Sequence, residues 1–98
     1  MIADNDPEGV ETTALFAAAD FRDARVLEIG CGGGRLTRRY ASATERVIGI
    51  DSSADSVIAA HRGRPRDLLR RLVYVRASGS ELPIAGSQFD VVVFGWSL

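Results

Sequence analysis

The sequence predicts an α/β protein built on a parallel sheet, and three observations carry this prediction. Four short runs rich in valine and other apolar residues alternate with segments of helical periodicity. The runs lack the polar alternation of half-exposed strands, which is typical of a parallel sheet covered on both faces. A glycine-rich loop follows the first run and an aspartate ends the second. Ligands of open α/β sheets bind at the carboxyl ends of the strands, so these two features mark a candidate site.

The elements can be placed in order along the chain. Residues 10–20 have apolar side chains near helical spacing and predict a short helix that packs on the sheet. In the connector 63–71, Pro65 leaves room for one helical turn at most. The remaining elements are predicted as strands at 25–29, 47–50, 72–75 and 89–94 and as helices at 35–43 and 54–61.

The helix predicted at 54–61 has the clearest start signal in the sequence. Ser53 is the expected N-cap, and Asp55 lies where the positive end of the helix favours an acidic side chain. Val57 and Ile58 are expected to face inward, toward the sheet.

Length and composition restrict the classes of protein and partner. We expect residues 1–9 to be a flexible lead-in and residues 10–98 to form one small domain. The net charge of −1 argues against a chain whose main task is to neutralise phosphates. The single Cys31 excludes an internal disulfide framework, and the acidic start lacks a secretory signal, so cytoplasm is the expected compartment. No apolar run approaches the roughly 18 to 20 residues of a membrane span, so no membrane partner is expected.

The loop after the first strand is unusually rich in glycine, with the sequence Glu-Ile-Gly-Cys-Gly-Gly-Gly over residues 28–34. Glycine lets the backbone turn sharply and lets a ligand approach closer than a Cβ would permit. Free N–H groups at the start of the next helix can receive a carboxylate or a phosphate. An ordinary strand-to-helix turn is the alternative explanation. The dinucleotide spacing G-x-G-x-x-G fails here, because Arg35 or Thr37 stands where the third glycine belongs.

The spacing Glu-x-Gly-x-Gly-x-Gly instead resembles motif I of the class I S-adenosylmethionine-dependent methyltransferases. Asp51 stands at the end of the second strand, where that family holds the ribose, and residues 80–92 resemble the family's stretch before strand four. The resemblance covers about residues 25–98. It implies a Rossmann-like three-layer α/β/α fold with parallel strands in the order 3-2-1-4, lacking the later strands of the full seven-stranded sheet.

The resemblance also implies a cofactor, S-adenosylmethionine, and the residues around it. Glu28 would help to place the amino group of the methionine portion, and Asp51 would accept from both ribose hydroxyls. Ser78 departs from the family, which commonly has an aspartate there for the adenine amino group, so weaker cofactor binding is expected. The full set of implied cofactor-binding residues is Glu28, Gly30, Cys31, Gly32, Gly34, Asp51, Ser52, Ser78 and Gly79.

The sequence indicates no catalytic residue and no metal site. Beyond the fourth strand only residues 95–97 could reach an acceptor, and they include no general base. Trp96 is better explained by packing on the sheet, and Ser97 has no convincing partner for nucleophilic catalysis. His61 is the only histidine, and a place on a helix surface explains it best. Cys31 is expected to be a small loop residue.

The implied function is methyl transfer to an unknown acceptor by a truncated or split enzyme, and a small-molecule acceptor is favoured. The alternative is a non-catalytic S-adenosylmethionine-binding remnant, or a subunit completed by a partner chain. The fourth strand would lie at an exposed edge, which predicts self-association or pairing with a partner. A nucleic-acid acceptor and an NAD-linked oxidoreductase are less favoured. The nucleic-acid alternative depends on five arginines, Arg62, Arg64, Arg66, Arg70 and Arg71.

Overall fold

The computed structural model describes residues 20–78 and 88–95. The helix predicted at 10–20, the lead-in and the stretch 80–87 therefore fall outside, or almost entirely outside, the described residues. The elements are β1 (Arg25–Ile29), α2 (Arg35–Tyr40), η2 (Ala41–Ala43), β2 (Arg46–Asp51), α3 (Ala54–Arg62), η3 (Arg66–Leu68), β3 (Leu72–Arg76) and β4 (Val91–Phe94).

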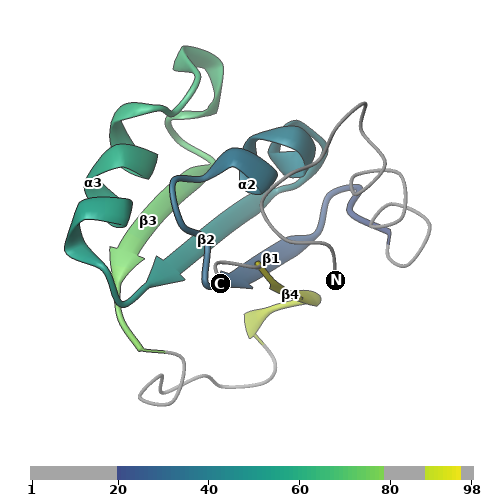
Figure 1. Cartoon of the computed structure of the whole chain (residues 1–98). Helices are drawn as coiled ribbons and strands as arrows, with labels where there is room; N and C mark the ends of the chain where they lie inside the picture. The colour runs from purple at the N-terminus through teal and green to yellow at the C-terminus, as the bar shows by residue number, and fades with distance from the viewer. Residues whose placement is uncertain (1–19, 79–87, 96–98) are drawn as a thin grey trace.

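The strands form a parallel sheet in the order β3-β2-β1-β4, which confirms the predicted order. Figure 1 shows the central pair β1 and β2 running side by side, with β3 and β4 on either flank. Glu28 of β1 lies beside Gly49 of β2, and Gly49 in turn lies beside Tyr74 of β3. The carboxyl ends of β1, β2 and β3 therefore meet at one edge of the sheet, where ligands of such folds bind.

The helices differ from the prediction in two details. The helix predicted at 35–43 is α-helical only to Tyr40, and its last turn tightens into the 3-10 segment η2, which is common at helix ends. Helix α3 begins as predicted, with the Ser53 hydroxyl accepting a hydrogen bond from the Ser56 N–H at 3.2 Å. The inward placement of Ile58 is wrong, because its side chain is 49% exposed. Ala60 and Val57 form the buried face of α3 instead, and Ile58 points away, one position further round the helix.

The fourth strand begins two residues later than predicted. Asp90 precedes it and binds Arg25 at the start of β1: the backbone N–H and the guanidinium of Arg25 both donate to its carboxylate. The Asp90 N–H donates to the Arg25 carbonyl at 2.8 Å. This local exchange of hydrogen bonds fixes the entry into β4, and regular pairing with β1 starts at Val91.

The two faces of the sheet are covered differently within the described residues. On one face, Leu36 and Tyr40 of α2 and Ala60 of α3 pack with apolar side chains of all four strands. Successive strand residues point to opposite faces, so the next residue along each strand lies on the other face. Four side chains on that second face are between 40% and 65% exposed, namely Val73, Val75, Val92 and Phe94.

Candidate functional site

In the loop between β1 and α2, every second residue has a positive φ angle. Gly30, Gly32 and Gly34 have φ values of 76°, 55° and 83°, in the left-handed region that favours glycine. These are the three glycines that the sequence spacing singled out. Gly34 is the N-cap of α2, so the last of the three turns leads directly into the helix.

Most of the loop's backbone groups are bound within the chain. The N–H groups of Gly30 and Cys31 both donate to the Ile50 carbonyl, each at 2.9 Å, and the Gly34 N–H donates to the Cys31 carbonyl at 3.0 Å. The Arg38 guanidinium donates to the Gly33 carbonyl at 2.9 Å. The loop is therefore held in place before any ligand binds, which is the preorganisation that a binding site needs.

Asp51 connects the loop to the next turn. Its Oδ2 accepts from the Gly32 N–H and its Oδ1 from the Ser53 N–H, both at 2.9 Å. The residue is only 8% exposed. A carboxylate has about four acceptor positions, so two remain after these bonds. Asp51 can therefore hold the loop and still accept hydrogen bonds from a ligand with two hydroxyls.

A hollow of about 160 Å³ lies at the carboxyl ends of β1, β2 and β3. It contains four of the residues predicted from the sequence, Gly30, Asp51, Ser52 and Ser78. Three further lining residues, Ile29, Ile50 and Ala77, were not predicted, because apolar strand ends carry no chemical signal. A second hollow of about 270 Å³ shares Ser52, Ala77 and Ser78 with the first and adds Arg76. The last predicted residue, Gly79, lies outside the described residues.

Glu28 is placed differently from the other predicted residues. Its side chain is fully buried on the helix-covered face of β1. Its Oε1 accepts from the Thr37 hydroxyl at 2.9 Å and from the Tyr40 hydroxyl at 2.5 Å. The carboxylate thus joins β1 to α2 beneath the glycine loop. Its contact with the amino group of a cofactor stays a prediction.

The thiol of Cys31 lies in the same buried region. Burial, together with the charges of Glu28 and Asp51, raises the pKa of Cys31 to about 12. The thiol is protonated at neutral pH and is a poor nucleophile, since only the thiolate reacts. This agrees with the interpretation of Cys31 as a small loop residue.

Sequence reasoning missed Tyr74, a residue that lies beneath the loop. Its ring packs against Gly49 of the neighbouring strand, where a Cβ would come within 2.7 Å of the ring carbon Cδ1. Glycine inside a strand often marks a site where another group approaches closely. Gly49 was therefore the signal in the sequence that could have revealed this packing.

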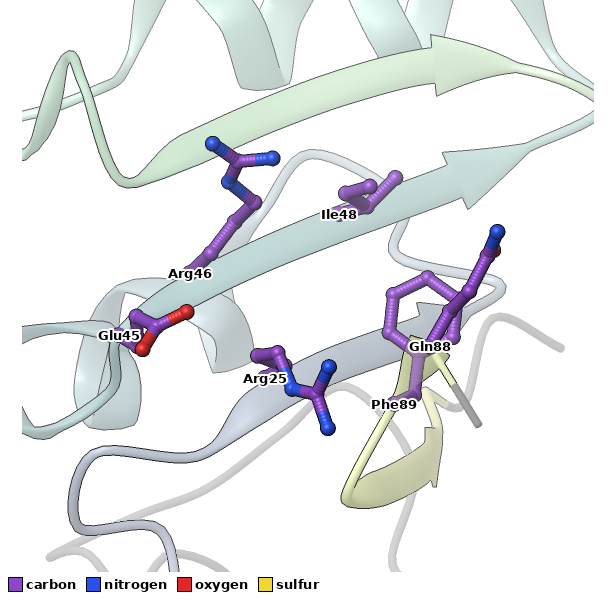
Figure 2. A pocket seen from close by; sticks show the side chains of 6 residues that line it. All are labelled: Arg25, Glu45, Arg46, Ile48, Gln88 and Phe89. Carbon is purple, nitrogen blue, oxygen red and sulfur yellow. The ribbon is translucent and has the colours of Figure 1, made fainter. Parts of the chain in front are cut away.

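A larger hollow of about 420 Å³ lies at the opposite end of the strands (Figure 2). Arg25 and Arg46, which line it, are the first residues of β1 and β2. Arg25 is engaged by Asp90 at 3.1 Å. The lining residues are Arg25, Glu45, Arg46, Ile48, Gln88 and Phe89. They mix both charges with apolar groups, and no nucleophile or buried acid lies among them, so the hollow carries no evident chemistry.

Among the described residues, His61 and the five arginines of the nucleic-acid alternative are not part of the lining of the hollow that contains Asp51. Within the described ranges, no three His, Cys, Asp or Glu side chains come together as metal ligands would. Trp96 and Ser97 fall outside the described residues. Of the five arginines, Arg64 donates to the carbonyls of Leu69 and Leu72 and so braces its own connector. Arg71 binds the Ser42 and Thr44 carbonyls in the same way. The stretch is therefore partly structural.

No helix in the described part of the chain is long and apolar enough to span a membrane.

Comparisons with known proteins identify the family of the chain. Residues 26–98 match the family model described as "Methyltransferase domain". The chain is 33% identical over 69 residues to the ubiquinone biosynthesis O-methyltransferase of Azorhizobium caulinodans, covering 70% of this chain and 27% of that protein. It is 37% identical over 76 residues to the malonyl-[acyl-carrier protein] O-methyltransferase of Enterobacter lignolyticus, covering 78% and 27%.

A solved structure gives the same result for the fold. The S-adenosylmethionine-dependent methyltransferase of Mesorhizobium loti superimposes with a TM-score of 0.77 and 24% identity, covering 92% of this chain and 41% of that one. The chain thus spans about a quarter of the length of these two sequence relatives.

Proposed function

We propose that this chain, which belongs to the class I S-adenosylmethionine-dependent methyltransferase family, binds S-adenosylmethionine in the hollow at the carboxyl ends of β1, β2 and β3. One observation carries the proposal: Asp51 holds the Gly32 N–H and lines the same hollow as Gly30, Ser52 and Ser78. A ligand in this hollow meets a carboxylate, two hydroxyls and bare backbone. These groups suit a nucleoside joined to an amino acid.

The residues present fit such a ligand. Asp51 keeps two acceptor positions, the number that two ribose hydroxyls need. The space above Gly32 is open, because a Cβ placed there would meet no atom within 4 Å. We assign the ribose to Asp51, the edge of the adenine to Ser52, Ser78 and Gly79, and the methionine portion to the glycine loop, which contains Cys31. Glu28 supports the methionine portion.

The proposed reaction is methyl transfer to a small-molecule acceptor. The bound cofactor supplies an electrophilic methyl group on a sulfonium, and this chain contributes its position relative to the acceptor, since proximity alone can supply large rate factors. The two relatives named above act as O-methyltransferases, which favours an oxygen atom as the acceptor. No residue of this chain is assigned as a catalytic acid or base.

A second candidate is a cofactor-binding unit whose fold is completed by another polypeptide. It is favoured by the apolar side chains of β3 and β4 that are exposed on the second face of the sheet. An assay of methyl transfer by the chain alone, with and without a candidate partner, separates the two. Transfer without a partner would contradict this second candidate.

Calorimetric titration with S-adenosylmethionine and S-adenosylhomocysteine tests the proposed site. Asp51→Ala is expected to weaken binding about 100-fold or more, because two hydrogen bonds to a charged group contribute about 1.5–3 kcal/mol each. Asp67→Ala, which removes an exposed carboxylate in η3, is the matched control and should bind like the wild type. Equal binding by wild type and Asp51→Ala would contradict the ribose assignment.

Ser78 offers a second test in the same titration. Its side chain lines both adjoining hollows. Ser78→Asp restores the acidic residue common in the family and should tighten binding about threefold to tenfold, since a charged acceptor binds an amine more strongly than a hydroxyl does. Weaker binding by Ser78→Asp would contradict the placement of the adenine at Ser78.

A further inference from the structure

Tyr74 spans the space between β3 and the glycine loop. It is 6% exposed and lies on the helix-covered face of β3, beside Gly49 in the strand register. A Cβ at Gly49 would lie 2.7 and 2.8 Å from the ring carbons Cδ1 and Cε1, which shows that the ring lies across β2. Only glycine at position 49 leaves room for the ring in this orientation.

The far end of the same ring reaches the loop. A Cβ at Gly34 would collide with the Tyr74 hydroxyl and would lie 2.9 Å from Cζ. The ring thus fills the space between Gly49 on one strand and Gly34 at the start of α2. Gly34 and Gly49 therefore both lack a Cβ at the places where the Tyr74 side chain packs.

The hydroxyl oxygen is the atom of Tyr74 nearest to the Cβ position of Gly34, so it contributes to this contact by its size. It is buried and makes no hydrogen bond of ordinary geometry within the described residues. The Thr37 side chain nevertheless lies close enough to interact with it and to oppose part of the rise in its pKa. Burial raises the pKa of Tyr74 to about 12, so the phenol is neutral at physiological pH. The size and reach of the whole side chain therefore support the loop, and the ring supplies most of that bulk.

The loop is consequently supported from two sides. On the side of the hollow, Asp51 holds the Gly32 N–H. On the underside, the Tyr74 ring lies against Gly34. If the ring were absent, residues 32–34 would keep their hydrogen bonds to Asp51, Cys31 and Arg38 but would lose the packing beneath Gly34. The Asp51 carboxylate at the end of β2 would stay where it is.

We propose that Tyr74 is a positioning residue that sets the height of the glycine loop and so selects for the amino-acid half of the bound cofactor. This inference rests on the proposed function, which assigns the methionine portion to the loop. It predicts that a loss of the ring affects a ligand with an amino-acid portion more than a ligand that contains only the nucleoside.

Two probes separate these halves. S-adenosylhomocysteine carries the amino acid, whereas 5′-methylthioadenosine keeps adenine, ribose and sulfur without it. Tyr74→Leu should weaken S-adenosylhomocysteine about tenfold and 5′-methylthioadenosine about twofold or less, where tenfold corresponds to about 1.4 kcal/mol. Tyr74→Phe keeps the ring and removes only the hydroxyl oxygen beside Gly34, so its losses should be much smaller than those of Tyr74→Leu. Val75→Ala, on the same strand but on the opposite, exposed face, is the matched control.

A second variant reaches the ring from its other end. Gly49→Ala should push the ring aside and give the same selective loss for S-adenosylhomocysteine. Gly49→Ala combined with Tyr74→Leu should be only slightly worse than Tyr74→Leu alone, because the clash with the ring disappears and only the tight approach to Cys31 Cβ at 3.2 Å remains. Circular dichroism confirms that each variant is folded before its affinities are compared.

The outcomes are distinguishable. Equal losses for both probes, or no loss for S-adenosylhomocysteine in Tyr74→Leu and Gly49→Ala, would overturn the role of Tyr74 and leave the proposed function standing. Losses that add in the double variant would overturn the steric connection between residues 49 and 74. A wild-type chain that binds neither probe would overturn the proposed function and this inference with it.

Discussion

The sheet has a hollow at each end of its strands, and the polar groups suited to binding a ligand line the smaller of the two. The hollow at the amino ends of the strands is about 420 Å³ and is bordered by exposed charges of both signs. The hollow at the carboxyl ends is about 160 Å³, yet a nearly buried carboxylate, two serines and a glycine turn converge on it. A nearly buried carboxylate that binds two backbone N–H groups thus favours the smaller hollow as the candidate site, whatever the volumes of the two hollows.

The largest expected effect is a loss of stability of the fold in alkali, and it arises from buried groups beneath the glycine loop. Cys31 has an ordinary pKa of 9.0 and is raised by burial to about 12, and burial also raises the pKa of Tyr74 and of Tyr40. An unfolded chain loses these protons first, so their stabilising contribution is complete below pH 9 and is lost as the pH rises toward 12. The free energy of unfolding should fall by roughly 1.4 kcal/mol per pH unit for each group that ionises only in the unfolded chain.

Urea unfolding at pH 8, 9, 10 and 11 measures this effect. In Cys31→Ala the slope between pH 9 and 10 should flatten, because the tyrosines begin to ionise only near pH 10 in the unfolded chain. A slope that is the same with and without Cys31 would show that the thiol is not buried as described.

The next largest effect is expected at the last glycine of the loop. Gly34→Ala forces a side chain into a left-handed backbone conformation, which costs about 1–3 kcal/mol, and adds a collision with Tyr74. Both the free energy of unfolding and the affinity for S-adenosylhomocysteine should drop. Gly33→Ala is the matched control, since Gly33 has no positive φ and a Cβ there meets nothing within 4 Å. Equal effects of the two substitutions would contradict the loop geometry.

A smaller effect is expected from the buried tyrosines, which differ in their hydrogen bonding. Tyr40→Phe removes a donor to the buried Glu28 carboxylate and should lower the free energy of unfolding by about 1–3 kcal/mol. Tyr74→Phe removes a hydroxyl without such a partner and should change it much less. Urea denaturation of the two variants side by side measures the difference. A greater loss of unfolding free energy in Tyr74→Phe than in Tyr40→Phe would indicate that the Tyr74 hydroxyl makes a strong hydrogen bond, for which Thr37 is the candidate partner.

The smallest effect is expected at the amino end. The guanidinium of Arg25 lowers the pKa of Asp90 through hydrogen bonds, so this pair stabilises the fold above the ordinary pKa of 3.8 and loses its effect in acid. Because the pair is exposed, Arg25→Ala should shift the urea midpoint only slightly at pH 7, and cofactor affinity should not change. A marked loss of cofactor affinity in Arg25→Ala would indicate that the cofactor binds at the amino ends of the strands and not at their carboxyl ends.

The sequence predicted the frame of this molecule well because its signals were local. Ser53 has the hydroxyl of an N-cap, and the structure places it there. The glycine spacing indicated three special backbone positions, and all three have positive φ. Asp51 was predicted at the end of its strand and lies there, facing the hollow.

The parts that the sequence did not predict depend on contacts between distant segments. The orientation of Ile58 is set by which side of α3 meets the sheet, and a short helix with apolar residues at neighbouring positions does not decide this. The burial of Glu28 depends on Tyr40 and Thr37, which are 12 and 9 residues away. The contact of Tyr74 with Gly34 crosses two strands, and only the glycine inside β2 hinted at it.

The Ile50 carbonyl accepts two successive N–H groups of the loop, and this bifurcation has an evolutionary consequence. It ends the ladder between the two central strands and, together with the Asp51 carboxylate, holds the loop at the edge of the hollow. The side chains of Ile29 and Ala77 line the hollow but take no part in these hydrogen bonds, so we expect substitutions there to leave the loop in place. New ligand preferences can thus arise on this scaffold by changing side chains while the loop itself is inherited unaltered.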